Sequence, residues 1–145
     1  MAELLLIVRL AGRRVALPAR EIEAVVELEG LTPVPGAASH IAGLSALRSR
    51  VLTVIDSRAS LGLTAEGEGG SCEAIVVPSG GHTYALLVEQ IEDVIESHSE
   101  AVPVQAPPGA GWDRVAKGFV EADGDLLLLA DPHLLIAGPP VLAAA

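Results

Sequence analysis

Residues 41–58 read IAGLSALRSRVLTVIDSR, and this stretch decides the predicted fold. Residues 44–47 and 51–55 are short and mostly apolar, and the charged corner Arg48-Ser49-Arg50 separates them. Apolar runs of strand length on both sides of a tight polar corner predict a β-hairpin. Asp56 follows the second run at the position of a helix N-cap, so we expect one helical turn after the hairpin.

The composition predicts a small domain with an aliphatic core. The chain has 145 residues, 50% of them hydrophobic, but only one Trp, one Tyr and one Phe. This length supports one domain, or two small subdomains in one chain. The formal net charge of −10 argues against binding to nucleic acid or to an anionic membrane surface, because both need clustered Lys and Arg.

The N-terminal segment does not resemble a signal peptide, and no apolar run approaches the ~20 residues that a membrane helix needs. Cys72 is the single cysteine, which excludes an internal disulfide, and we expect a buried structural thiol there. We therefore expect a cytoplasmic protein with no direct membrane insertion.

The sequence repeats itself once. A shift of 69 positions carries Val8 onto Val77 and Gly12 onto Gly81, and a shift of 75 positions carries Gly43 onto Gly118. The same second shift brings the two predicted caps, Asp56 and Asp131, into register. Two similar halves of about five short strands each are therefore predicted, and closing such small sheets into barrels would remove their unpaired edges.

We predict an all-β fold of two small barrels packed together. The whole is expected to be a single domain over residues 4–136, with approximate halves at 4–65 and 72–136. Whether strands are exchanged between the halves stays open. Residues 137–145 are expected to be a frayed tail.

No catalytic or metal-binding set is recognisable, so we expect no enzyme activity, no metal and no cofactor. Asp56 and Asp131 are interpreted as structural caps, and not as paired catalytic acids, because they occupy equivalent positions of the repeat. None of the histidines has a second His or Cys at metal-ligand spacing, and surface histidines without a special role are expected. They lie in turns or at element ends: His40, His82, His98 and His133.

Arg48 is the strongest candidate for a binding residue. The chain has only nine basic residues, and two of them stand at this hairpin corner beside apolar strands. Arginine with an apolar surround is typical of protein-binding patches. The alternative is an ordinary solvated arginine, because hairpin corners are usually polar.

Taken in order, these motifs resemble the CheW family of bacterial chemotaxis coupling proteins and the related regulatory domain of the CheA kinase. The resemblance runs over nearly the whole chain, from about residue 4 to residue 136. The motifs that carry it are LLLIVRL (4–10), VALP (15–18), IEAV (22–25), VP (34–35), IAGL (41–44), LR (47–48), VLTVIDSR (51–58), ALLVEQI (85–91), LLAD (128–131) and LL (134–135).

The resemblance implies two five-stranded, SH3-like barrels and a non-catalytic adaptor. Such an adaptor would couple the cytoplasmic tip of a chemoreceptor to the regulatory domain of a CheA-type histidine kinase. It also implies an apolar groove for the helical receptor tip, with Arg48 at its rim. The implied partner-binding residues are Ile22, Glu23, Val25, Arg48, Ser49, Val51 and Val54.

Four positions depart from the family pattern. Ser49 stands where the family usually has Gly, Ala24 where it has Glu, Glu89 where it has Asp, and Ser57 where it has Leu. The first two departures fall on positions associated with partner binding. The alternative prediction is therefore a divergent interaction module of the same fold that serves pilus motility or another chemosensory-like pathway.

Overall fold

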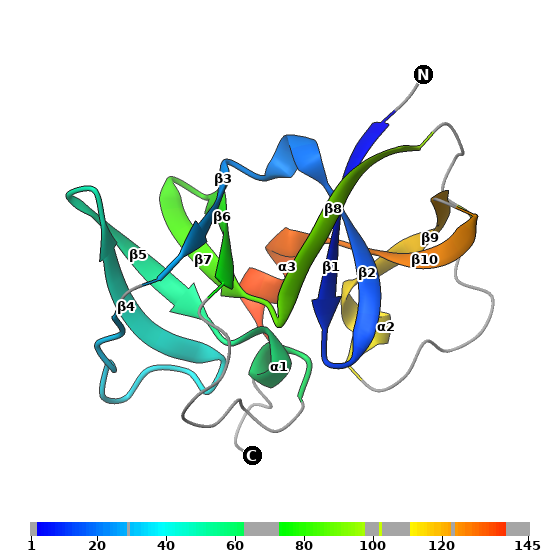
Figure 1. Ribbon diagram of the computed structural model, residues 1–145. Helices are drawn as coiled ribbons and strands as arrows, with labels where there is room; N and C mark the ends of the chain where they lie inside the picture. Colours follow the sequence, from blue (N-terminus) through cyan, green and yellow to red (C-terminus); the bar gives the residue numbers. More distant parts are fainter. Residues whose placement is uncertain are drawn as a thin grey trace, which may run out of the picture.

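Figure 1 shows two β-sheets that lie side by side, with short helices at the seam between them. The structure is a computed structural model, and it describes residues 3–28, 30–62, 73–97, 102, 111–122 and 124–138. Outside the described residues lie the segment 63–72, which contains Cys72, and residues 139–145, which make up most of the predicted tail. His98 also lies outside them.

We call the two sheets A and B. Sheet A has the order β8-β1-β2-β10-β9 and sheet B the order β3-β6-β7-β5-β4. The strands of sheet A are β1 (Glu3–Leu10), β2 (Arg13–Pro18), β8 (Gln90–Ser97), β9 (Ala116–Ala122) and β10 (Asp125–Ala130). Those of sheet B are β3 (Ala24–Glu27), β4 (Ile41–Leu47), β5 (Arg50–Ile55), β6 (Glu73–Ser79) and β7 (His82–Leu87). The short helices are η1 (Ala19–Glu21), α1 (Ser57–Ser60), α2 (Trp112–Val115) and α3 (Pro132–Ala137).

The sequence repeat is visible in this topology. The parallel pair β2–β10 places Leu128 beside Val15, and the parallel pair β5–β7 places Thr53 beside Tyr84. These two pairs are related by the same shifts of 69 and 75 positions that the sequence showed. Each sheet combines strands from both sequence halves, so strands are exchanged between them.

Three clusters of buried side chains, nearly all aliphatic, hold the sheets together. The largest is shared by the two sheets, and each of the others belongs to one sheet. Along β1, Ile7 lies in the cluster of sheet A, whereas Val8 lies in the shared cluster, and both are fully buried. A strand with both faces buried needs apolar residues throughout, which explains the uninterrupted apolar run of β1.

The fold is all-β, as predicted, and two five-stranded sheets fit SH3-like subdomains. Neither sheet is a complete barrel, however. In sheet B the chain that follows β3 reaches β4 through one isolated bridge, Thr32 to Leu44, and in sheet A Val102 and Phe119 form the equivalent bridge. The predicted removal of sheet edges is therefore only partial.

Candidate protein-binding surface

The β4–β5 hairpin presents Arg48 at its corner. Leu47 pairs with Arg50, so Arg48 and Ser49 form a two-residue turn. Both have left-handed backbones, with φ of 49° and 69°, which is what the tight turns of hairpins require. Both are exposed, and within the described part of the chain the Arg48 guanidinium has neither a hydrogen bond nor an ion pair. It is therefore available to a partner.

Arg50 ties this hairpin to the segment that leads into β3. Its Nη1 donates to Glu23 Oε2 at 2.9 Å, and its Nη2 donates to Thr83 Oγ1 on β7 at 2.9 Å. The Arg50 and Glu23 side chains are 49% and 42% exposed, so the ion pair adds little to stability. Its consequence is geometric. It holds Glu23 near the hairpin and leaves the charge of Arg48 uncompensated.

The predicted apolar residues do not all share one surface. Val51 and Val25 are exposed, at 66% and 48%, whereas Ile22 is partly buried against the shared core. Two strands, β6 and β7, lie between β3 and β5, so Val25 and Val51 are not neighbours. The prediction for Val54 was wrong: it is fully buried in the core of sheet B and supports the hairpin from beneath.

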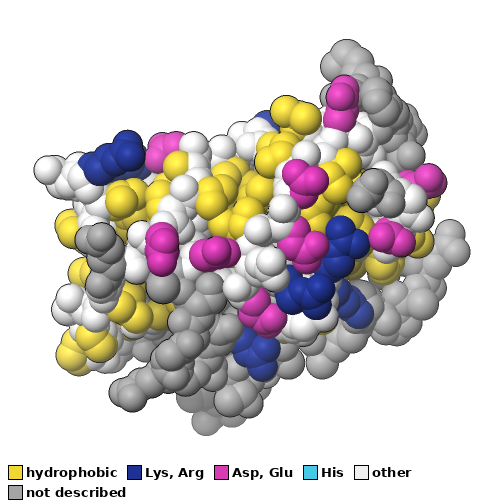
Figure 2. Space-filling view, viewed as in Figure 1, with side chains coloured by type: hydrophobic (Ala, Val, Ile, Leu, Met, Phe, Trp, Pro, Cys, Tyr) yellow, Lys and Arg dark blue, Asp and Glu magenta, His cyan; other side chains and the backbone are white. Residues whose placement is uncertain are grey.

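Figure 2 shows a basic patch at the upper left, where Figure 1 places the end of the β4–β5 hairpin, with acidic and apolar side chains beside it. The structure thus links Glu23 to the hairpin through Arg50, whereas the next residue, Val51, points to the opposite face of β5. Strands β6 and β7 separate Val25 from Val51, and Ile22 packs against the shared core.

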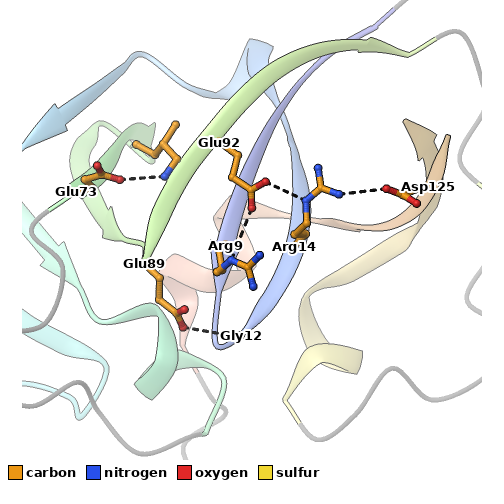
Figure 3. A network of polar contacts seen from close by, with 8 residues as sticks. Arg9, Gly12, Arg14, Glu73, Glu89, Glu92 and Asp125 are labelled. Carbon is orange, nitrogen blue, oxygen red and sulfur yellow. Dashed lines mark hydrogen bonds and ion pairs between the residues drawn. The ribbon is translucent and has the colours of Figure 1, made fainter. Parts of the chain in front are cut away.

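A second charged cluster, which the sequence reasoning missed, lies on sheet A (Figure 3). The Nε of Arg14 donates to Glu92 at 3.0 Å, and its Nη1 donates to Asp125 at 3.2 Å, while Arg9 lies 3.8 Å from Glu92. The shifts of 69 and 75 positions relate this cluster to the one at the hairpin, because Glu23 aligns with Glu92, Arg14 with Thr83, and Arg50 with Asp125. The alignment shows that the positions are equivalent, but it does not predict the contacts.

Asp56 and Asp131 have the geometry of the predicted caps. The Asp56 carboxylate accepts a hydrogen bond from the Ala59 N–H at 3.1 Å, at the start of α1. The Asp131 carboxylate accepts one from the His133 N–H at 2.9 Å, at the start of α3.

Two of the four histidines, His40 and His133, differ from the prediction of surface residues without a role, whereas His82 is exposed and His98 lies outside the described residues. His40 is buried, its Nε2 lies 3.0 Å from the Ile136 carbonyl oxygen, and its ring packs against Gly138. His133 places Nδ1 3.0 Å from Ser79 Oγ and Nε2 2.8 Å from Glu21 Oε2. The hydrogen bond with His133 lowers the pKa of Glu21 below its usual value. These contacts join η1, β6 and α3, so the role of His133 is structural.

Among the described residues, no three His, Cys, Asp or Glu side chains are grouped so that they could hold a metal ion. The described helices are also too short or too polar to cross a membrane.

Comparisons with known proteins agree with this architecture. The sequence profile of the family described as "CheW-like domain" matches residues 4–139. The chemotaxis protein CheW of Rhizobium meliloti (strain 1021) is 26% identical over 114 residues, which is 76% of this chain and 74% of that protein. The crystal structure of the scaffolding protein TtCheW from Thermoanaerobacter tengcongensis superposes with a TM-score of 0.79 and 22% identity. The superposition covers 93% of this chain and 92% of that one.

Proposed function

Because the chain belongs to the CheW-like domain family, we propose that it is a non-catalytic scaffold that couples a chemoreceptor to a CheA-type histidine kinase. Its partners would be the cytoplasmic tip of the receptor and the regulatory domain of the kinase. The expected cytoplasmic location stays a prediction.

The observation that carries this proposal is Arg48, which is exposed at the hairpin corner beside the exposed Val51 and has no ion pair with any described residue. An arginine that no described carboxylate neutralises can form a charge-assisted hydrogen bond with a partner. Val51 adds apolar area next to that charge, and the combination of arginine with apolar area is enriched at protein interfaces.

A scaffold of this kind needs no chemistry of its own. Several weak contacts on one small domain assemble receptor and kinase, because binding one partner raises the local concentration of the other. The exchange of strands between the sheets suits this role, since the two subdomains share a core and present their surfaces at a fixed relative position.

The test is a calorimetric titration of the protein with the regulatory domain of the CheA-type kinase from the same cell. We expect saturable binding with a dissociation constant in the micromolar range, about −8 kcal/mol. Arg48→Glu should weaken it by about 2 kcal/mol or more, the size of a hot-spot loss, with an unchanged circular dichroism spectrum. Lys117 is exposed on β9 of sheet A. Lys117→Glu makes the same change of charge there and should leave the affinity unchanged.

The alternative, a divergent module for a pilus-motility or other chemosensory-like pathway, rests on Ala24 and Glu23. Ala24 carries no charge, and the adjacent Glu23 is engaged by Arg50, so the surface near Arg48 offers no free carboxylate from this segment. Titration against the kinases of each such pathway in the cell separates the two proposals. Failure to bind any of them would remove the coupling role.

A further inference from the structure

The outer edge of β4 in sheet B carries an unused pair of backbone hydrogen-bonding groups. Alternate residues of a strand point their N–H and C=O away from the antiparallel neighbour. On β4, Leu44 points outward and exchanges two hydrogen bonds of 2.8 Å with Thr32. Ala46 points the same way, two residues on, and its N–H and C=O have no partner within the described residues.

A surface depression lies beside this open position. The bridge between Thr32 and Leu44 sets a register that would place Gly30 opposite Ala46. Gly30 and Ala46 form no such bridge, and the two segments line an open surface depression of about 330 Å³. Nothing lies within 4 Å of the position that a Gly30 Cβ would take. The depression is lined by Gly30, Leu31, Thr32, Leu44, Ser45 and Ala46.

The same place in sheet A is closed, which provides a comparison within the molecule. Glu121 on β9 is the repeat equivalent of Ala46, and its carbonyl accepts a hydrogen bond from Ser97 Oγ at 3.0 Å. Ser97 is the last residue of the eight-residue strand β8. In sheet B the equivalent strand β3 has four residues, and Leu28, which has no hydroxyl, stands at the position of Ser97. Among the described residues, the shorter strand thus leaves the edge of β4 open at Ala46.

The surroundings of Ala46 define what would fit. Val51 is the direct cross-strand neighbour of Ala46, and its side chain is 66% exposed. Arg48, two residues beyond Ala46, is exposed and unpaired within the described part of the chain. A strand added antiparallel to β4 would place one side chain next to Ala46 and Val51. The residues before it would pass the end of β4 and run toward Arg48 in the turn.

We propose that the edge of β4 at Ala46 binds an extended segment of a partner protein, which adds a short strand to sheet B. The segment carries an aliphatic residue opposite Ala46 and an acidic residue two positions earlier, close to Arg48 in the turn. This binding mode needs backbone pairing, unlike the docking of a helical tip, and it does not depend on the coupling role.

The probe is the peptide acetyl-Thr-Glu-Thr-Val-amide, which ends before the position that Thr32 occupies beside Leu44, and it is titrated into the ¹⁵N-labelled full chain. We expect saturable shifts of the amide signals of Gly30, Ala46 and Val51. A peptide with Lys in place of Glu should bind more weakly, and equal binding would overturn the role of Arg48. Absence of saturable shifts at these amides would overturn the proposal.

Ala46→Pro removes the outward N–H, and proline is tolerated where the N–H of an edge strand faces solvent. This variant should bind the peptide about tenfold more weakly, as expected for a lost hydrogen bond. Glu121→Pro makes the same change at the equivalent, closed position and should bind as tightly as the parent.

If Ala46→Pro proves unfolded, Val51→Glu takes its place, because it puts a carboxylate beside the aliphatic residue of the peptide at an exposed position. Unchanged affinity in the variant used would overturn the proposal. Self-association of the parent chain in sedimentation, absent from Ala46→Pro, would also overturn it, because the edge would then bind a second copy of the chain.

Discussion

At the scale of single residues, the hairpin corner has a backbone that its sequence does not favour. Ser49 has a φ of 69°, in the left-handed region where a side chain costs roughly 1 kcal/mol and where glycine is at ease. We predict that Ser49→Gly raises the free energy of unfolding by about 0.5 to 1 kcal/mol. Urea denaturation followed by circular dichroism measures the change.

Ser49→Ala is the matched control, because it removes the hydroxyl but keeps the Cβ in the left-handed region. No gain in stability is expected from it. If the alanine variant were stabilised as much as the glycine variant, the hydroxyl and not the backbone would be the cause. The departure of Ser49 from the family pattern would then have no conformational cost.

At the scale of elements, the hairpins β4–β5 and β9–β10 are followed by the short helices α1 and α3. Helices of this length are not stable alone, so their caps matter. Asp56 begins α1 and Asp131 begins α3, and each accepts a backbone hydrogen bond. Asp56→Ala and Asp131→Ala should each lower the free energy of unfolding by about 1 kcal/mol. Thermal or urea denaturation would show the loss.

Asn keeps a side-chain oxygen that can accept the same hydrogen bond, so Asp56→Asn and Asp131→Asn should retain most of the stability. Equal losses in the Asn and Ala variants would show that the charge, and not the cap, stabilises these positions.

The hairpins and caps were predictable from the sequence because their signals are local. The helix α2 was not predicted, since its four residues follow a Pro- and Gly-rich segment and show no periodicity. Its role is visible only in three dimensions. Arg114 of α2 donates to the carbonyl oxygens of Leu134 in α3 and Ser60 in α1, at 2.6 Å each. These partners lie 20 and 54 residues away in the sequence.

At the scale of the whole molecule, the repeat predicted the two equivalent sheets, but the pairing of strands across the halves leaves no local signature. The burial of Val54 is one result. Val54 and Ile55 belong to different core clusters, because β5 is covered on both faces. The sequence VLTVI does not tell a strand that is covered on both faces from one with an exposed face. The pair of Glu23 and Arg50 is another, since neither residue indicates a partner 27 positions away.

The contact between Glu21 and His133 joins α3 to η1, the connection between β2 of sheet A and β3 of sheet B, and it predicts a pH dependence of global stability. The hydrogen bond with His133 is the main cause of the lowered pKa of Glu21, ahead of the positive charges of His133, Arg20 and Lys117. A carboxyl group with a lowered pKa in the folded state stabilises the fold above its unfolded pKa of about 4.5. This contribution is lost as the pH falls through the lowered folded value.

We therefore predict that Glu21→Gln lowers the free energy of unfolding near neutral pH, and that the difference from the parent shrinks as the pH falls below about 4.5. Both side chains are about one-third exposed, so the effect should be small and should weaken with added salt. Urea denaturation of parent and variant between pH 3 and pH 7 measures it, with the pH limits set by the usual carboxyl range. In a His133→Asn background the pH-dependent part of the difference should largely disappear, because its main cause has been removed. A difference that stayed constant with pH in the parent background would mean that Glu21 stabilises the seam through packing and not through its charge.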